Sequence, residues 1–311
     1  MNNLESILKL SYSPMTVFEF DIFREDKDIC DFLEATSVYI IAKRKLPIMR
    51  LIDSASNGFK ISVTMNNNSQ DIEILMLQED NIKLLHDGLM GIRVGNNTES
   101  KDEFHSITLL GKNERFIMNA NMDRLIHLDS NKKIKLRVKG DIVPFITYEV
   151  LYIGQCTEEH IFKRFKSHHA LMDILIKEKI IPPNYDKVND LLILPFNIES
   201  NIISELTGDS SEKDLVEGLT GRFSFDNKTI SLDCEKALIK AMDPKYNKQK
   251  FRQYPKSMDG LYNHNLKNII YRIEENIILE YGNDNKINGS MNPEEASIIS
   301  IKENNDFSII N

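Results

Sequence analysis

The sequence contains no tryptophan and only three cysteines among its 311 residues. Cys30, Cys156 and Cys234 do not have the spacing of metal-binding cysteines, so no zinc site is predicted. Their odd number is typical of a reducing compartment. No apolar run is long enough to cross a bilayer, and the first residues lack the basic and apolar regions of a signal peptide. We therefore expect a cytoplasmic protein that does not enter a membrane.

Positive charge is also scarce: 39 Lys and Arg residues stand against 47 Asp and Glu residues, which gives a formal net charge of −8. Such a balance is unfavourable for binding phosphates. One segment departs from it, because between Lys236 and Lys256 the only acid is Asp243, and aromatic residues are interleaved. This composition is typical of a surface that follows a nucleic-acid backbone, and also of a solvated helix end and loop. The side chains that we expect to contact nucleic acid are Lys163, Lys166, Lys245, Lys248, Lys250 and Arg252.

The stretch Tyr148–Cys156 alternates in the manner of a β-strand. The alternation places Tyr148 and Tyr152 on the same face, and Gly154 ends the strand at a turn. Tyr152 is therefore presented at the end of a strand. A half-buried strand aromatic would show the same pattern.

Downstream, a helix is predicted to begin at Thr157, a good N-cap that is followed by two glutamates. Arg164 and His168 lie one turn apart on this helix and share a face. An arginine can hold a phosphate through two hydrogen bonds, and a nearby histidine can donate a hydrogen bond or a proton. Taken singly, each residue would be interpreted as a solvated or partly exposed side chain.

A later helix carries an acid in an unusual place. We predict that Asp233 caps this helix and that Pro244 ends it. Glu235 then falls on the apolar stripe of the helix, where a carboxylate is costly unless it finds a cation or a metal such as Mg²⁺. Asn247 follows the helix and could orient a substrate or a neighbouring loop.

Together these residues resemble the GIY-YIG nuclease family, over roughly residues 138 to 262. Tyr152-Ile153-Gly154 matches the second half of the family's name. The later Arg, His, Glu and Asn follow in the family's order, and the Arg-to-His and Glu-to-Asn separations are the usual ones. The resemblance implies a small three-stranded sheet flanked by helices.

The resemblance also implies a role for each residue. Glu235 would be the single protein ligand of a divalent metal, Mg²⁺ or Mn²⁺. Tyr152 would help to activate the attacking water. Arg164 would hold the phosphate with the assistance of His168, and Asn247 would support the site.

Two features depart from the family. Its first motif should present a tyrosine shortly before the second motif, yet Gly140–Val150 has none at the matching place. Either Tyr148 substitutes for that hydroxyl or the first-motif function is absent. The stretch from His169 to Asp233 is also longer than a minimal domain needs. Within it, Leu191–Leu194 predicts a third strand and Phe223–Leu232 resembles a hairpin insertion.

The expected fold class is α+β, in three parts. Residues 1 to 137 are predicted to form a β-rich domain, residues 138 to 281 the GIY-YIG-like domain with its insertion, and residues 282 to 311 a flexible tail. Expected strands in the first part are Val17–Ile22, Phe59–Thr64, Ile72–Leu77, Phe104–Leu110 and Ile134–Val138, and expected helices are Asp26–Glu34 and Glu79–Gly88. We recognise no family in this part. It could recognise a substrate, bind a protein partner, mediate self-association or hold the nuclease inactive.

The sequence thus predicts a metal-dependent endonuclease that hydrolyses phosphodiester bonds, with DNA favoured over RNA. The way in which the family is deployed implies a role in restriction, phage defence or a mobile element. The alternative is a non-catalytic or partner-activated module that binds nucleic acid through a degenerate site.

Overall fold

The computed structural model describes residues 2–55, 58–65, 68–76, 91–94, 102–110, 112–114, 116–157, 159–166, 169–178, 189–204, 225–264, 266–302 and 306–311. Helices and strands are mixed throughout this part of the chain, which confirms the α+β class. The predicted helix Glu79–Gly88 and the predicted site residue His168 lie outside the described residues.

The chain forms two compact units, and the second is inserted into the first. Unit 1 consists of Met1–Lys43, Tyr148–Lys179 and Leu191–Asn311, and unit 2 consists of Arg44–Thr147 and Ile180–Asp190. This differs from the predicted division at residue 137, because the first 43 residues belong with the C-terminal half of the chain. The reason is strand pairing across the insertion, which no local pattern reveals.

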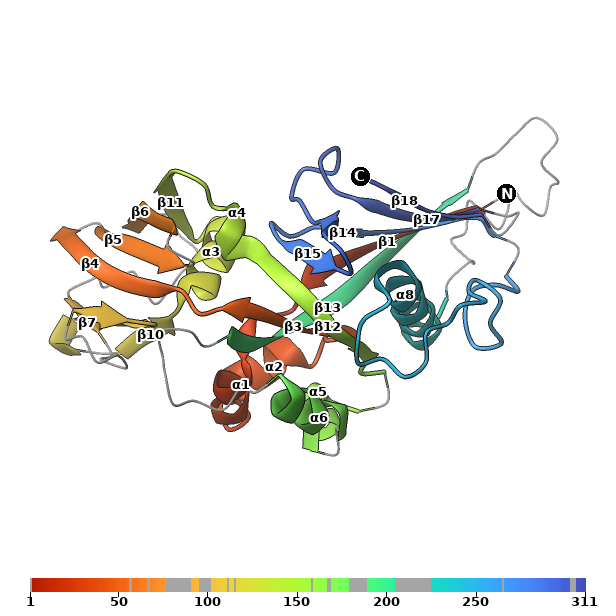
Figure 1. Ribbon diagram of the computed structural model, residues 1–311, viewed down its shortest axis with the longest axis horizontal. Helices are drawn as coiled ribbons and strands as arrows, with labels where there is room; N and C mark the ends of the chain where they lie inside the picture. The colour runs from red at the N-terminus through yellow and green to blue at the C-terminus, as the bar shows by residue number, and fades with distance from the viewer. Residues whose placement is uncertain are drawn as a thin grey trace. The chain divides into compact units, whose positions relative to one another are not determined.

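Unit 1 is built on one large sheet (Figure 1). Its strand order is β16-β15-β12-β3-β13-β1-β14-β17-β18, and β2 pairs with β13. These strands are β1 (Asn2–Leu10), β2 (Met15–Thr16), β3 (Val38–Lys45), β12 (Thr147–Gln155), β13 (Asn189–Ser204), β14 (Leu266–Ile273), β15 (Ile278–Tyr281), β16 (Asn285–Asn288), β17 (Ile298–Lys302) and β18 (Phe307–Ile310). The sheet is therefore larger than the three-stranded one that we expected, although the predicted third strand at Leu191–Leu194 is confirmed within β13.

The C-terminal strands also correct the predicted flexible tail. The segment after Gly282 contains the strands β16, β17 and β18, and β17 pairs antiparallel with β14 from Ile298 to Lys302. The polar composition of this segment reflects the short turns between the strands, while alternating Ile299 and Ile301 are buried.

The helices of unit 1 are α1 (Val17–Phe23), α2 (Lys27–Leu33), α5 (Ile161–Lys166), α6 (His169–Lys177) and α8 (Asn227–Met242). Helix α2 confirms the prediction at Asp26–Glu34. The strand expected at Val17–Ile22 is instead α1, because Thr16 and Glu19 form a reciprocal capping box: each backbone N–H donates to the other side chain, at 2.9 and 3.0 Å.

Helix α8 covers one face of the sheet (Figure 1). Its buried Cys234, Leu238 and Met242 belong to the same core cluster as Val38 and Ile40 of β3. Burying a Leu or Met side chain stabilises the folded state by about 1.5–3 kcal/mol, so this contact fixes α8 on the sheet. The predicted hairpin at Phe223–Leu232 is wrong from Asn227 onward, where the chain is already helical.

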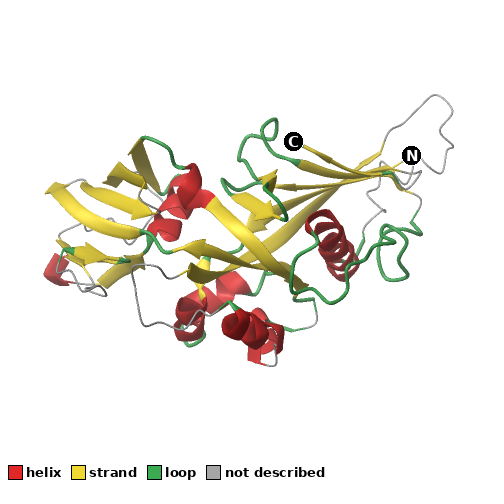
Figure 2. Ribbon diagram, viewed as in Figure 1, coloured by secondary structure: helices red, strands yellow, loops and turns green. Residues whose placement is uncertain are grey.

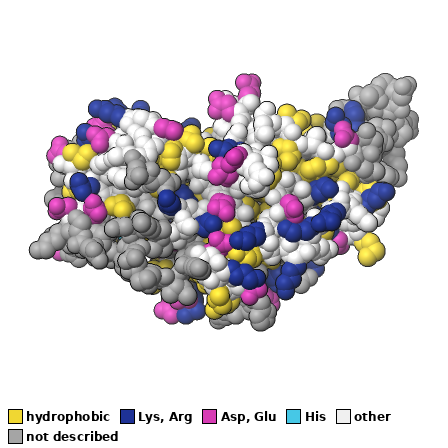
Figure 3. Space-filling model, in the orientation of Figure 1, with side chains coloured by type: hydrophobic (Ala, Val, Ile, Leu, Met, Phe, Trp, Pro, Cys, Tyr) yellow, Lys and Arg dark blue, Asp and Glu magenta, His cyan; other side chains and the backbone are white. Residues whose placement is uncertain are grey.

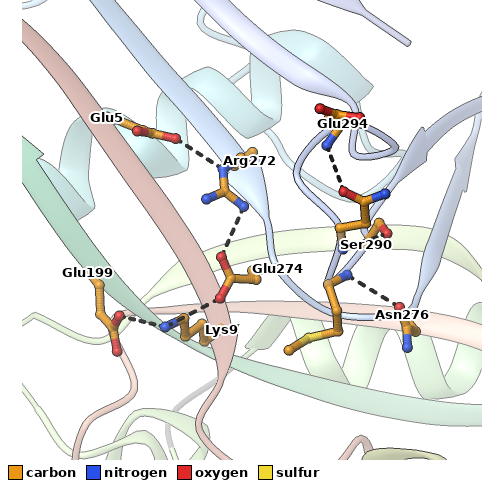
Figure 4. Close-up of polar contacts among 10 residues, drawn as sticks. Glu5, Lys9, Glu199, Arg272, Glu274, Asn276, Ser290 and Glu294 are labelled. Carbon is orange, nitrogen blue, oxygen red and sulfur yellow. Dashed lines mark hydrogen bonds and ion pairs between the residues drawn. The ribbon is translucent and has the colours of Figure 1, made fainter. Parts of the chain in front are cut away.

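The other face of the sheet carries different contacts along its length. At β3 and β12 it meets α1 and α5, where Phe20 lies 4.4 Å from Phe162 and 4.9 Å from Phe165 between ring centroids. At β13, β1 and β14 it carries ion pairs instead (Figure 4). Lys9 pairs with Glu199 at 2.7 Å and with Glu274 at 3.5 Å, and Arg272 pairs with Glu274 and Glu5, each at 3.0 Å.

Unit 2 is mostly β-structure, as Figure 2 shows, with two separate sheets. Their orders are β11-β6-β5-β4-β8 and β10-β9-β7. The elements are β4 (Ile48–Ala55), β5 (Gly58–Met65), β6 (Asn68–Met76), β7 (Gly91–Val94), β8 (Glu103–Phe104), β9 (Ile107–Leu110), a 3₁₀ turn (Lys112–Glu114), β10 (Phe116–Ala120), α3 (Met122–Ser130), β11 (Ile134–Lys139) and α4 (Val143–Ile146). The strands predicted at Phe59–Thr64, Ile72–Leu77 and Ile134–Val138 are confirmed apart from their ends, whereas Phe104–Leu110 divides into β8 and β9.

Candidate active site

Two tyrosines from neighbouring strands form the centre of the candidate site. Strands β3 and β12 pair antiparallel, with Tyr39 opposite Gly154 and Ile41 opposite Tyr152. The rings of Tyr39 and Tyr152 are stacked, with their centroids 6.1 Å apart and their planes at 29°. Tyr39 was missed by the sequence analysis because unit 2 separates it from Tyr152. The signal that could have found it is the strand-like Ser37–Ile41, which places a tyrosine just before the long insertion.

Gly154 is required by the approach of Tyr39. A Cβ added at residue 154 would lie 2.5 Å from both Cζ and Oη of Tyr39, and 2.9 Å from Cε1 of Tyr152. These distances are far below a van der Waals contact, so no other residue fits without moving the tyrosines. The glycine of the Tyr-Ile-Gly motif therefore has a physical role in this chain.

Tyr148 does not belong to this pair, which corrects the prediction that it shares a face with Tyr152. A bulge between Val150 and Tyr152 shifts the register of β12 and reverses the alternation of its side chains. Tyr148 is only 2% exposed and lies in the core cluster under α8, together with Val150 and Ile153. Its interpretation as a packed strand aromatic is therefore the better one.

Arg164 reaches the tyrosines from α5. This helix is held in place by its buried Ile161 and by Phe165, whose ring centroid lies 4.9 Å from that of Tyr39. Arg164 is exposed, and it hydrogen-bonds the Tyr39 hydroxyl. Thr157 does not cap the helix as predicted. It precedes the helix, and its backbone N–H and its hydroxyl both donate to the Gln155 side chain.

Glu235 completes the group from α8. Asp226 is the N-cap of this helix, so Asp233 is not the cap that we predicted, and Glu235 lies well inside the helix. The carboxylate is near enough to Arg164, Tyr152 and Cys156 to influence their pKa values or its own. Tyr39, Tyr152, Arg164 and Glu235 are thus brought together from four separate segments.

Burial governs the protonation of this group. Burial raises the pKa of Glu235 to about 7, with the nearby positive charge of Arg164 opposing the rise. Burial likewise raises the pKa of Tyr39 and Tyr152, and it raises the pKa of Cys156 to about 12. Both tyrosines are therefore neutral at physiological pH and act as hydrogen-bonding hydroxyls.

Asn247 fastens the turn after α8 to the Tyr-Ile-Gly strand. Its side-chain amide donates to the backbone oxygen of Ile153 at 2.7 Å, and its side-chain oxygen accepts from the Ile153 N–H at 2.9 Å. Asn247 is 7% exposed, so it does not reach solvent freely. It therefore supports Ile153, the residue next to Tyr152 in β12.

Two further carboxylates, Asp233 and Glu178, connect the elements that carry the site. Neither of these connections is predicted by the sequence. Asp233, 1% exposed, accepts from the Tyr254 hydroxyl at 2.6 Å, from the Tyr271 hydroxyl at 2.7 Å and from the Leu261 N–H at 2.8 Å. It therefore ties α8 to β14 and to the loop between them.

The second carboxylate, Glu178, follows α6. It accepts from Lys43 at 2.9 Å, from Lys245 at 2.7 Å and from the Tyr246 hydroxyl at 2.6 Å. Burial opposes its charge, but these three hydrogen bonds together lower the pKa of Glu178 to about 2. Glu178 thus joins β3, which carries Tyr39, to the turn that carries Asn247.

The predicted nucleic-acid-binding side chains divide into two groups. Lys245 is engaged with Glu178, Lys250 pairs with Asp243 at 2.9 Å, and Lys163 pairs with Glu159 at 3.1 Å. Lys166 ends α5. Lys248 and Arg252 are exposed. Figure 3 shows Lys and Arg side chains gathered over α8 and the loop that follows it.

The two exposed cations, together with Lys256, are the ones available for a phosphate. None of the three forms an ion pair with another described residue. The pairing of Lys245 was not expected, because Glu178 is distant from it in sequence.

The arrangement fits a magnesium ion held largely by water and substrate. Among the described residues, no group of three His, Cys, Asp or Glu side chains could enclose a metal. Mg²⁺ is commonly bound by one or two carboxylates, with waters and phosphate oxygens filling the other positions. Glu235 suits that role because no hydrogen bond or ion pair to another described residue occupies its buried carboxylate. A cation would also relieve the burial cost that raises its pKa.

Comparisons of this chain with protein-family models, with curated proteins and with solved structures found no match. No helix in the described ranges is long and apolar enough to span a membrane.

Proposed function

We propose that this chain is a metal-dependent endonuclease of the GIY-YIG type, acting on DNA. The observation that carries the proposal is the convergence of Tyr39, Tyr152, Arg164 and Glu235. Tyr39 supplies the tyrosine that was missing from the first motif. It comes from a strand that is adjacent to the Tyr-Ile-Gly strand in the sheet but far from it in the chain.

Each of these residues has its own role in the proposed phosphodiester hydrolysis. The exposed Arg164 guanidinium binds the scissile phosphate and offsets the negative charge that grows in the transition state. The neutral hydroxyls of Tyr39 and Tyr152 orient the attacking water through hydrogen bonds. Glu235 holds the metal, which when bound acts as a Lewis acid toward the phosphate and the attacking oxygen. His168 is proposed to assist at the phosphate, as the resemblance implies.

Asn247, Glu178 and Asp233 keep this arrangement rigid. Each ties one of the active segments to a neighbour through at least two hydrogen bonds. Rigid placement matters because a displacement of about 1 Å in a catalytic group can reduce the rate by about a hundredfold. The proposal includes a cytoplasmic location, which rests on the composition of the sequence, and a role in restriction, phage defence or a mobile element, which rests on the family resemblance.

The test is an assay of metal-dependent cleavage by the full-length chain. Plasmid, linear duplex, single-stranded DNA and RNA are incubated with Mg²⁺ or Mn²⁺, and then with a chelator added. Glu235→Gln is the matched variant, because it keeps the shape of the side chain and removes its charge. We expect DNA cleavage that requires metal and is lost in Glu235→Gln.

Two outcomes would overturn the proposal. Unchanged cleavage by Glu235→Gln would show that Glu235 is not the metal ligand. Metal-independent binding of DNA with no cleavage under any condition would favour the non-catalytic module instead.

A further inference from the structure

The loop that follows α8, Phe251–His264, contains no helix or strand of its own, yet it is fastened to α8 at four points. The Tyr254 hydroxyl and the Leu261 N–H both donate to Asp233, at 2.6 and 2.8 Å. Lys236 forms a close ion pair with Asp259, and the Lys240 ammonium donates to the backbone oxygen of Arg252 at 2.9 Å. The α8 residues that make these contacts flank Glu235 on both sides. The loop is therefore held rigidly beside the proposed metal ligand.

Close packing at Gly260 also fixes the loop. A Cβ at residue 260 would lie 2.4 Å from Oδ1 of Asp233 and 2.6 Å from Oγ of Ser257. No residue larger than glycine therefore fits at this position while the contacts to Asp233 are kept.

Met258 belongs to this loop and is 98% exposed. It is the most exposed large apolar side chain that the structure describes. Because the loop is tied down on both sides of Met258, this exposure belongs to a fixed conformation. At this exposure Met258 is not packed against the rest of the described chain.

Most of the other exposed side chains of the loop are polar, and two of them are basic. Arg252 and Lys256 are exposed and form no ion pair with other described residues. Gln253, Asn263 and His264 are also exposed and can donate or accept hydrogen bonds at base edges. The loop's single acid, Asp259, is already paired with Lys236. An exposed apolar side chain in a loop whose Arg252 and Lys256 pair with no acid of the described residues suits a nucleic-acid duplex, since proteins that kink DNA insert apolar wedges between base pairs and hold the phosphates with Lys and Arg.

We propose that the loop Phe251–His264 docks on duplex DNA and that Met258 inserts between adjacent base pairs. The choice of DNA rests on the proposed function. Partial unstacking at that step bends the duplex toward unit 1, which presents the phosphate backbone to Arg164 and Glu235. Arg252 and Lys256 contact phosphates on either side of the opened step.

The test measures base unstacking by the full-length chain in the presence of a chelator, so that cleavage does not interfere. A duplex carrying 2-aminopurine becomes more fluorescent when that base loses its stacking partner. We expect a rise with the wild-type chain. Met258→Ser should abolish the rise and weaken duplex affinity by about tenfold, the equivalent of one good contact. Affinity for single-stranded DNA should be unchanged, because it has no base step to open.

Met291→Ser is the matched control. Met291 is 43% exposed in the turn between β16 and β17, away from the loop in sequence, and its variant should behave as wild type. A fluorescence rise that persists in Met258→Ser overturns the wedge and leaves the proposed nuclease intact. A Met258-dependent rise without metal-dependent cleavage sustains the wedge and overturns the nuclease. No binding of duplex by the wild-type chain overturns both, and Met258 would then belong to a protein interface.

Discussion

Tyr39 lies directly opposite Gly154, and its hydroxyl occupies the space that a Cβ at residue 154 would need. Gly154→Ala should therefore push the Tyr39 ring away from Tyr152, lower cleavage and destabilise the fold by about 1–3 kcal/mol, the usual cost of overpacking. A double-mutant cycle with Tyr39→Ala checks the cause, with the free energy of unfolding measured by urea titration. In the Tyr39→Ala background the added methyl group still meets Cε1 of Tyr152 at 2.9 Å but no longer meets the Tyr39 ring, so Gly154→Ala should cost clearly less than in the wild-type background. Equal losses in both backgrounds would show that the two residues are not coupled.

The two tyrosines outside the Tyr-Ile-Gly motif should respond differently to loss of one oxygen. Tyr39→Phe should reduce the cleavage rate by about a hundredfold, because it removes a hydroxyl that bonds Arg164 and orients the water. Tyr152→Phe should be at least as damaging. Tyr148→Phe is the control, since Tyr148 is buried in the core under α8 and should affect stability more than rate. Wild-type rates for Tyr39→Phe, with a large loss for Tyr148→Phe, would reverse the assignment.

Arg164→Ala should slow the chemical step far more than it weakens binding. Removing a preorganised donor to the developing charge typically costs about 3 kcal/mol of transition-state stabilisation. Arg164→Lys should restore little of this, since a lysine cannot make two parallel hydrogen bonds to a phosphate. The neighbouring Lys163→Ala serves as the control because Lys163 pairs with Glu159 on the surface. Single-turnover rates separate chemistry from binding. Full activity in Arg164→Lys would show that a point charge suffices.

Local patterns in the sequence predicted individual elements well. The strand at Tyr148–Gly154 and the helix after Asp26 were correct, because alternation and capping residues are encoded within a few positions. The helix at Val17–Phe23 was also encoded locally, in the capping box of Thr16 and Glu19. The apolar residues within this segment alternate, however, and their alternation favoured a strand.

Relations between distant segments could not be predicted in this way. No pattern near Tyr152 shows that its strand partner lies before unit 2, and none shows the bulge that turns Tyr148 into the core. Asp233 was taken for a cap because it precedes an apolar stripe. Its true partners, Tyr254 and Tyr271, are brought to it only by the packing of α8 on the sheet. The site residues were thus recognisable by type and order, whereas their supports depend on the tertiary fold.

The hydrogen bonds that Glu178 accepts should make the free energy of unfolding depend on pH in the acid range. Hydrogen bonds from Lys245, Tyr246 and Lys43 lower its pKa from 4.5 to about 2. Its stabilising contribution is therefore present above the ordinary pKa and is lost as the pH falls toward 2. We expect Glu178→Gln to be less stable than wild type at about pH 6, by about 2 kcal/mol after allowance for screening at the exposed lysine, and the difference to vanish near pH 2.

Urea titrations at several pH values measure this dependence. Glu280→Gln is the control, because Glu280 makes a surface pair with Lys286 at 3.4 Å that should contribute little at any pH. A constant difference between wild type and Glu178→Gln over the whole range would show that the loss comes from packing rather than from charge.

The last prediction places substrate binding on three cations of the segment after α8 that pair with no acid among the residues the structure describes. Neutralising Lys248, Arg252 and Lys256 together should flatten the dependence of log affinity on log salt by about 0.9 for each phosphate contact that is lost. Neutralising Lys245 and Lys250 should change the slope less and stability more, because both are engaged with acids of the chain.

The comparison surface is β11 of unit 2, where Lys135, Arg137 and Lys139 are exposed at alternate positions of an edge strand. Lysines on an edge strand commonly prevent sheet-to-sheet association, so neutralising these three should promote aggregation and leave the salt slope unchanged. DNA titrations across a range of salt concentrations, with light scattering as the second readout, separate the two effects. The contrary outcome is a flatter salt dependence when the three β11 cations are neutralised and no change when Lys248, Arg252 and Lys256 are neutralised. Unit 2 would then carry the surface that binds the substrate, and the active site in unit 1 would act on a duplex that unit 2 holds.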